Sequence, residues 1–244
     1  MFDYYNKKIV VVAGGSGYLG SHVVRALIEA NFFVVVIAIK NKNNSVNNDS
    51  VYFIEVDITN PEDVIKGAQA VMDKFGKIFA VIHLASASLI RQSVLSGSSD
   101  DFQSQFRVNV IGAFNLFKYF CPNIVKGGMI IGITSQAIES GALITPSGSY
   151  VPAKYALRGL LRVLATELHG QLINVCAVAP AFMPGGLNSD IPEPAMEFIK
   201  KKSQPENITS PQEVAQVIVD LVDDKIKNIN GKNIAIPGGL ITNL

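Results

Sequence analysis

The sequence contains no tryptophan, two cysteines and three histidines among its 244 residues, and charged residues make up only 17% of it. Cys121 and Cys176 stand in apolar surroundings without metal-like spacing, so we interpret them as reduced packing residues and expect no metal site. A net charge of +1 gives no electrostatic reason to expect nucleic acid or a membrane surface as partner. No apolar run is long enough for a membrane span or a signal-peptide core. These absences favour a soluble, cytoplasmic protein that acts on a small molecule.

Hydrophobic residues make up 48% of the chain, which suits a sheet covered on both faces. Short runs rich in Val and Ile alternate with helical patterns almost to the end. The alternation predicts a single α/β domain over residues 1–244, a Rossmann-type doubly wound parallel sheet of about seven strands with helices on both faces. An asparagine-rich segment at 40–50 predicts a loop where a crossover helix is usual. The expected strands are 8–13, 33–39, 51–56, 79–84, 129–134, 173–178 and 233–236, and the expected helices are 19–30, 61–75, 100–120, 149–168 and 211–223.

Three glycines, Gly14, Gly17 and Gly20, lie between the first expected strand and the first expected helix. Glycine at these places permits a tight turn, close approach to a pyrophosphate and close packing of the helix on the strand. The helix N-terminus then offers free N–H groups and a positive dipole end to the phosphates. The turn therefore predicts dinucleotide binding rather than a merely structural role. The expected contacts are Gly14, Ser16, Gly17, Tyr18, Leu19 and Gly20.

The end of the second expected strand carries no carboxylate of the kind that binds the ribose 2′-hydroxyl of NAD. It carries Lys40 and Lys42, which can pair with the 2′-phosphate of NADP or simply solubilise a loop. We therefore expect NADP as the cofactor, with NAD as the alternative. Asp57, at the end of the third strand, can accept from the adenine amino group, form a turn, or cap the helix that begins at Pro61.

Tyr150 and Lys154 are four residues apart in an expected helix, so both side chains can point into one site. A free phenol has a pKa of about 10 and is a poor acid or base at neutral pH. A fixed cation nearby stabilises the phenolate and lowers that pKa. The pair alone is also compatible with an ordinary helix surface, so its meaning depends on a cofactor site around it.

Taken in order along the chain, these motifs resemble the short-chain dehydrogenase/reductase family across nearly the whole sequence. The glycine spacing and the run from His83 to Ala85 are similar to the extended branch of that family, which acts on nucleotide sugars. The chain after Tyr150 is too short for the sugar-binding domain of that branch, so the resemblance is to the classical type. It is carried by the glycine turn, Asp57, His83, Leu84, Ala85, Ser86, Asn109, Ser135, Tyr150, Lys154, the run Ala179 to Ala181, the run Ile229 to Lys232 and the run Pro237 to Gly239.

The resemblance implies a role for each residue of a catalytic set. Tyr150 would protonate a carbonyl oxygen during reduction, and Lys154 would lower the Tyr150 pKa and bind the nicotinamide ribose. Ser135 would hold the substrate oxygen, and Asn109 would keep a proton-relay water beside Lys154. The further cofactor contacts that it implies are Lys40, Asp57, Ile58, Leu84, Ala85, Ser86, Pro180, Ala181 and Phe182.

Several residues depart from the family pattern. Ala13 replaces the usual threonine before the glycine motif, and Ala181 replaces a glycine that follows the sixth strand. Ser135 lies two residues further upstream of the tyrosine than is typical. We interpret His83, at a buried strand end, as a packed and hydrogen-bonded histidine rather than a catalytic one.

The expected substrate walls at 86–90, 142–147 and 182–194 are mainly apolar and carry no arginine or lysine, which favours a neutral carbonyl compound. Pro184, Gly185 and Gly186 predict a lid within a substrate-loop region at 182–203. By resemblance, helices 100–120 and 149–168 would form the interface of a homodimer or homotetramer. The expected substrate contacts are Ser86, Leu143, Ile144, Phe182, Met183 and Leu187.

We therefore predict an NADP-dependent ketoreductase or alcohol dehydrogenase that transfers hydride between nicotinamide and a carbonyl or secondary alcohol. Two alternatives stay open. One is an epimerase or dehydratase of the extended branch. The other is a dinucleotide-binding regulatory protein that has lost activity.

Overall fold

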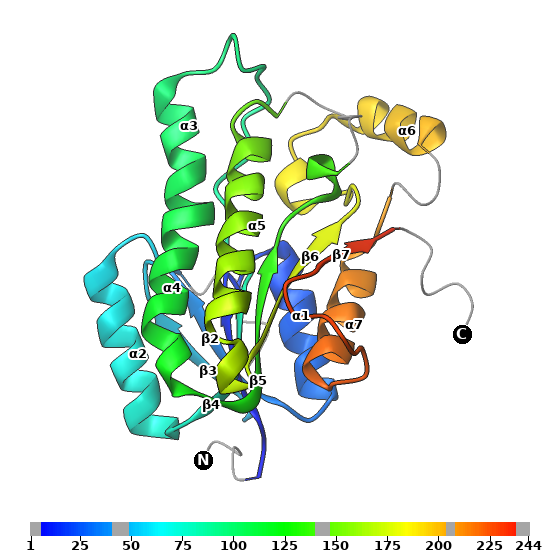
Figure 1. The fold of residues 1–244 in the computed structure, drawn as a ribbon. Helices are drawn as coiled ribbons and strands as arrows, with labels where there is room; N and C mark the ends of the chain where they lie inside the picture. Colours follow the sequence, from blue (N-terminus) through cyan, green and yellow to red (C-terminus); the bar gives the residue numbers. More distant parts are fainter. Residues whose placement is uncertain (1–5, 41–48, 140–146, 204–207, 238–244) are drawn as a thin grey trace.

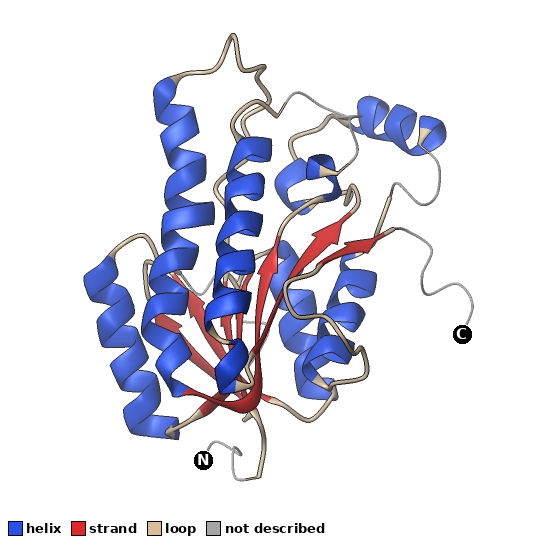
Figure 2. Cartoon of the chain, in the orientation of Figure 1, coloured by secondary structure: helices blue, strands red, loops and turns tan. Residues whose placement is uncertain are grey.

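The computed structural model describes residues 6–40, 49–139, 147–203 and 208–237. Its centre is a seven-stranded sheet in the order β3-β2-β1-β4-β5-β6-β7, and every neighbouring pair of strands is parallel (Figures 1 and 2). Because this order reverses between β1 and β4, a crevice forms at the carboxyl ends of these two strands. The predicted fold class is therefore confirmed. The strands are β1 Ile9–Ala13, β2 Phe33–Ala38, β3 Val51–Glu55, β4 Ile78–His83, β5 Ile124–Ile133, β6 Asn174–Pro180 and β7 Asn233–Ile236.

Helices cover both faces of the sheet, with α1 and α7 on one face and α2, α4 and α5 on the other (Figure 1). Strand β1 shows how the sequence builds two cores, because Val10 and Val12 pack under α1 and α7 while Val11 and Ala13 pack on the opposite side. All four side chains are fully buried. A strand buried on both faces reads as a continuous apolar run, as this one does. The helices are α1 Tyr18–Glu29, α2 Pro61–Phe75, α3 Ser99–Phe106, α4 Ala113–Phe120, α5 Tyr150–Glu167, α6 Glu193–Lys202 and α7 Pro211–Val222.

Two helices begin where the sequence places a polar cap before a proline. The Asn60 side chain accepts from the Glu62 N–H at the start of α2. Ser210 and Glu213 form a reciprocal capping box at the start of α7. Proline at the first helical position costs no hydrogen bond, because that N–H has no partner within the helix. The predicted alternative that Asp57 caps helix α2 is therefore wrong, because Asn60 is the capping residue.

The structure differs from the expected elements in two places. The expected helix at 100–120 is interrupted by a π-helical turn, η1 at Arg107–Gly112, which separates α3 from α4. Helix α6 begins within 182–194, where the sequence predicts a wall of the substrate site and no helix. The helix lies beyond the carboxyl ends of β6 and β7 (Figure 1). Most of the expected loop at 40–50 falls outside the described residues. Within the described ranges, no helix combines the length and apolar character that a membrane crossing requires.

Candidate active site

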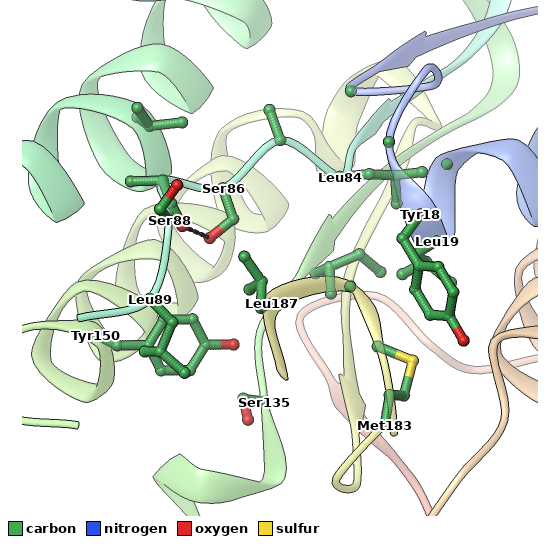
Figure 3. Close-up of a pocket in the computed structure, with 18 of the residues that line it drawn as sticks. Tyr18, Leu19, Leu84, Ser86, Ser88, Leu89, Ser135, Tyr150, Met183 and Leu187 are labelled. Atoms are coloured by element: carbon green, nitrogen blue, oxygen red, sulfur yellow. Dashed lines mark hydrogen bonds between the residues drawn. The ribbon is translucent and has the colours of Figure 1, made fainter. Parts of the chain in front are cut away.

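A cavity of about 1250 Å³ opens at the carboxyl ends of the central strands. It extends from the glycine turn after β1, past the ends of β2 and β3, to the residues that follow β4, β5 and β6. Segments far apart in the sequence therefore share one cleft, and Figure 3 shows Tyr18 and Leu19 on one side of it and Ser135 and Tyr150 on another. Crevices at this edge of a doubly wound sheet are where such folds bind ligands.

The glycine turn is too tightly packed for larger residues. Gly14 has φ +82°, its N–H donates to the Ile37 carbonyl at 2.8 Å, and a Cβ atom there would lie 2.7 Å from the Ala85 nitrogen. A Cβ atom on Gly20 would lie 2.1 Å from the Gly14 carbonyl oxygen. Helix α1 therefore starts in close contact with the turn, and the turn lies against the residues that follow β4.

Helix α1 presents an uncompensated N-terminus to this cavity. Its N-cap residue, Gly17, makes no side-chain capping bond, and its first turn holds no acidic residue. Helices α2 and α7, by contrast, have a side-chain cap and glutamate in the first turn. Free N–H groups and a positive dipole end suit an anion. Together with the close-packed glycines, this end of the cavity fits the diphosphate of a dinucleotide.

The next part of the cavity lies at the ends of β2 and β3. The Ser16 hydroxyl donates to the Lys40 carbonyl oxygen at 3.0 Å, which ties the glycine turn to the end of β2. One carboxylate oxygen of Asp57 accepts from the N–H and the hydroxyl of Thr59, both at 2.8 Å, so Asp57 does form a turn. Lys40, Asp57 and Ile58 all line the cavity. Lys42 lies outside the described residues.

Three residues of the predicted catalytic set gather at the other end of the cavity. Tyr150 and Lys154 lie one turn apart at the start of α5, and the Lys154 ammonium is 5.5 Å from the centre of the Tyr150 ring. Lys154 is 2% exposed and donates to the Ile133 carbonyl oxygen at 2.8 Å. Ser135 follows β5 and lies beside the phenol (Figure 3). A hydroxyl, a phenol and an ammonium thus face one space.

The electrostatics of this trio differ from the sequence expectation. Burial lowers the pKa of Lys154 to about 7. Burial also raises the pKa of Tyr150 to about 12, although hydrogen bonding from Ser135 acts in the opposite direction. The expected lowering of the Tyr150 pKa by Lys154 is therefore wrong for the protein by itself. The reason is that the loss of water around the buried phenol outweighs the opposing hydrogen bond with Ser135.

Asn109 is fully buried within the π-helical turn η1 and does not line the cavity directly. Its amide donates to the Gln105 main-chain and side-chain oxygens at 2.9 and 3.0 Å. Its side-chain oxygen has no hydrogen-bond partner among the described residues. Single π-helical turns are frequent at functional sites, where they redirect backbone groups.

His83 is also fully buried, with its ring edge-on to Phe117 at 6.2 Å between centroids. The packed position was expected, but neither ring nitrogen forms a hydrogen bond within the described part of the chain. Burial, reinforced by the charge of Lys154, lowers the pKa of His83 to about 3. The ring therefore stays neutral over the physiological range.

A family model described as enoyl-(acyl carrier protein) reductase matches residues 14–241. The 3-oxoacyl-[acyl-carrier-protein] reductase FabG of Thermotoga maritima is 28% identical over 190 residues, which cover 76% of this chain and 75% of that protein. The chain belongs to the short-chain dehydrogenase/reductase family of oxidoreductases. The match spans the glycine turn, the Tyr150/Lys154 pair and the C-terminal strand alike.

Other members of the family match along nearly the full length. The 3-hydroxyacyl-CoA dehydrogenase type-2 of Drosophila melanogaster is 25% identical and covers 95% of this chain and 96% of its own. Among solved structures, the Pseudomonas aeruginosa RhlG/NADP active-site complex superposes with a TM-score of 0.87 at 25% identity, covering 98% of this chain and 99% of that one. These matches support the classical type of the family.

For this member of the short-chain dehydrogenase/reductase family, most residues predicted for the site do line the cavity. Asn109 does not, and Leu143 and Ile144 lie outside the described residues. Sequence reasoning missed Ser104, Val108 and Ser203, which come from α3, η1 and the end of α6; nothing in their local sequence distinguishes them. The predicted residues in the lining are Gly14, Ser16, Gly17, Tyr18, Leu19, Gly20, Lys40, Asp57, Ile58, Leu84, Ala85, Ser86, Ser135, Tyr150, Lys154, Pro180, Ala181, Phe182, Met183 and Leu187.

Proposed function

We propose that the protein is an NADP-dependent ketoreductase or alcohol dehydrogenase acting on a neutral, mainly apolar carbonyl compound or the corresponding secondary alcohol. The observation that carries the proposal is the shared cavity, which begins at the glycine turn and ends at Ser135, Tyr150 and Lys154. A dinucleotide extended along such a cleft has its diphosphate at the N-terminus of α1 and its nicotinamide near the trio.

In this proposal the nicotinamide supplies or accepts the hydride, and the chain's own residues manage the proton. Tyr150 donates a proton to the carbonyl oxygen in the reductive direction; its raised pKa keeps the phenol protonated before the reaction, although it also makes the phenol a weaker acid. Ser135 holds the same oxygen by hydrogen bonding. Lys154, with a pKa of about 7, can exchange a proton with the site near neutral pH. Asn109 holds the π-helical turn against which α5 packs.

The preference for NADP rests on charge at the end of β2. Lys40 lines the cavity there, and strand β2 carries no carboxylate that would repel a 2′-phosphate. RhlG, a relative at 25% identity, was solved with NADP. Titration of the purified protein with NADPH and with NADH tests this point, and a Lys40→Glu variant should invert the preference. Equal affinity of the wild type for both cofactors would contradict the proposal for NADP.

The choice of an apolar substrate rests on the cavity wall near Tyr150. Among the described lining residues, Lys40 and Lys154 are the only lysines or arginines, and Lys40 lies at the far end. The two relatives above are named for 3-oxoacyl and 3-hydroxyacyl compounds, which carry a carbonyl or hydroxyl group on an apolar chain. The apolar lining residues on the side of Tyr150 include Leu89 and Leu187 (Figure 3).

The deciding experiment follows NADPH consumption with a panel of neutral ketones in the wild type, Tyr150→Phe and Tyr119→Phe. Tyr119 lies on α4, outside the cavity, and serves as the matched control. Loss of the general acid should lower turnover about 10²- to 10⁴-fold while leaving NADPH affinity unchanged. Tyr119→Phe should behave as the wild type does.

The same experiment separates the alternatives. A regulatory protein that only binds the dinucleotide would bind NADPH but turn over no ketone, and Tyr150→Phe would then change nothing. An epimerase or dehydratase would convert a nucleotide sugar without net consumption of NADPH. We further propose a homodimer or homotetramer that uses α4 and α5, whose exposed apolar side chains are considered in the Discussion.

A further inference from the structure

The loop between β6 and α6, residues 181–192, crosses the cavity and contacts two separate segments of the chain. Met183, Gly185, Gly186 and Leu187 of this β6–α6 loop line the cavity. The loop is also fastened within itself, because the Asn188 amide donates to the Met183 carbonyl oxygen at 2.9 Å. Figure 3 shows Met183 beside Tyr18 and Leu187 on the side of Ser135 and Tyr150. The loop therefore extends from the glycine turn to the catalytic trio.

The first contact is with Tyr18, the first residue of α1. Its hydroxyl donates to the Pro184 carbonyl oxygen at 3.0 Å. Gly185 has φ +94° and Gly186 has φ +58°, and Cβ atoms at these positions would lie 2.9 and 2.7 Å from atoms of the Tyr18 ring. The loop backbone thus lies flat on the phenol ring. Both positions require glycine for two reasons: the backbone has a positive φ, and a side chain would collide with the Tyr18 ring.

The second contact is with Arg91, in the segment between β4 and α3. Its Nε and Nη2 atoms donate to the two carboxylate oxygens of Asp190 at 3.0 and 2.7 Å, in a bidentate fork. Nη2 also donates to the Leu187 carbonyl oxygen at 3.2 Å and to the side-chain oxygen of Asn188 at 3.0 Å. The guanidinium is the rigid partner, since its side chain is 19% exposed whereas that of Asp190 is 56% exposed. Bidentate arginine–carboxylate pairs fix geometry as well as energy.

We propose that Tyr18 and Arg91 are positioning residues that hold the β6–α6 loop over the cavity, so that substrate affinity depends on two contacts remote from the reacting atoms. The proposal rests on the proposed function, because it takes the cavity wall near Tyr150 as the substrate site. It adds a link between the two ligands: Tyr18 starts the helix whose N-terminus faces the diphosphate and also supports the substrate loop.

This link has a thermodynamic consequence. A cofactor that orders the glycine turn around Tyr18 also favours the docked loop, and by reciprocity a docked loop favours cofactor binding. NADPH should therefore protect the β6–α6 loop from proteolysis. Undocking the loop should weaken the binding of both cofactor and substrate.

The test uses full-length wild type, Asp190→Asn, Arg91→Gln, the double variant and Tyr18→Phe. Asp220→Asn is the matched control, because Asp220 pairs with Lys225 beside α7, away from the cavity. Four quantities are measured: the rate of chymotrypsin cleavage after Leu187 with and without NADPH, the dissociation constant of NADPH, and kcat and KM for a ketone substrate.

Removal of the ion pair should raise the cleavage rate and KM about fivefold, which is the effect expected from the loss of a partly exposed bidentate ion pair. The value of kcat should stay within about twofold of that of the wild type. The double variant should be no worse than Arg91→Gln, because Arg91→Gln already removes the ion pair together with the bonds to Leu187 and Asn188. Tyr18→Phe keeps the ring but loses the bond to Pro184, so NADPH should protect its loop less than it protects that of the wild type.

Cleavage rates and KM values in Arg91→Gln that match those of Asp220→Asn would overturn the role of Arg91. An absence of NADPH protection in the wild type would overturn the role of Tyr18. If instead the proposed function were wrong, neither the wild type nor any variant would reduce a ketone, but the variants would still differ from the wild type in their cleavage rates.

Discussion

Lys154 donates a hydrogen bond of 2.8 Å to the main-chain carbonyl oxygen of Ile133, and this bond joins helix α5 to the end of β5 in an almost fully buried place. The bond fixes the ammonium next to Tyr150 and Ser135. It does not offset the loss of water around the charge, since burial still lowers the pKa of Lys154 to about 7 from its ordinary 10.5. The Lys154 ammonium is thus held beside Tyr150 although its burial lowers the free energy of unfolding.

We first predict that the free energy of unfolding rises between pH 7 and pH 9 when no cofactor is added. In this window the unfolded chain keeps Lys154 protonated whereas the folded protein releases the proton, so higher pH favours folding. The rise should be at most about 3 kcal/mol, because each pH unit contributes about 1.4 kcal/mol per proton. Denaturant unfolding at several pH values measures it.

The control for this prediction is Lys154→Met, which removes the titrating group and keeps a side chain of similar length. Its stability should be nearly independent of pH between pH 7 and pH 8 and should fall slightly as pH 9 is approached. The pKa values of Cys121 and Cys176 are raised to about 12 from an ordinary 9.0, so these thiols favour unfolding once they begin to ionise in the unfolded chain, whereas the raised pKa of Tyr150 acts only above about pH 10. A rise in stability that persists in Lys154→Met would assign it to another group.

The second prediction concerns acid. His83 has its pKa lowered to about 3, so between pH 6.5 and pH 4 the unfolded chain binds a proton that the folded protein does not. Stability should therefore fall by up to about 3 kcal/mol over this range through His83 alone. A His83→Asn variant, measured by the same unfolding method, should lose less stability than the wild type does. An identical acid dependence in the two proteins would exclude His83 as the source.

The fold was predictable because its signals are local. Buried strands such as β1 and β2 consist almost entirely of β-branched residues, and Asn60 before Pro61 marks the start of α2. The π-helical turn η1 could not be predicted in this way, since it adds one residue to a turn without a change in composition. Helix α6 was missed because prolines at 192 and 194 suggested a wall rather than a helix, although proline is well tolerated in a first turn.

Only those parts of the site whose residues lie close together in the sequence could be predicted. The glycine turn and the Tyr150/Lys154 pair have fixed spacing along the chain, so sequence alone brings their members together. Arg91 and Asp190 are 99 residues apart, and only the folded chain shows that they meet. The pKa of Tyr150 also depends on how completely the folded chain buries the phenol, and the four-residue spacing from Lys154 does not indicate this.

The third prediction compares two glycines. Gly20→Ala places a methyl group 2.1 Å from the Gly14 carbonyl oxygen, so the turn must shift. We expect a loss of about 2 kcal/mol or more in stability and a loss of NADPH binding, since overpacking against backbone has little room to relax. Gly170→Ala in the turn η4, His169–Gln171, is the matched control, because nothing lies within 4 Å of its Cβ position. It should change the stability by no more than about 0.5 kcal/mol.

Thermal or denaturant unfolding of both variants measures the change in stability, and a cofactor titration measures the change in binding. If Gly20→Ala bound NADPH as tightly as the wild type, the close approach of α1 to the turn would not matter for the cofactor. If Gly170→Ala also lost binding, the effect would not be specific to the glycine turn.

The last prediction concerns assembly. The helices α4 and α5 lie on one side of the sheet (Figure 1), and together with the turn η1 they expose large apolar side chains. Ile111 and Phe114 are 49% and 45% exposed, and Tyr155 and Val163 are 52% and 55% exposed. Apolar surface of this kind is typical of contacts between copies of a chain. We therefore expect the wild type to sediment as a dimer or tetramer.

Phe114→Asp should shift the protein to a smaller assembly, because the interface would then contain an unpaired charge. The dimer dissociation constant should rise on the order of a hundredfold, corresponding to about 3 kcal/mol. Ile65→Asp on α2 is the matched control, since Ile65 is equally exposed at 46% but lies on a different helix. Equal dissociation by both variants would mean that added charge weakens assembly without regard to its place. A wild type that stays monomeric at every concentration would show that the α4–α5 face is not an interface between copies.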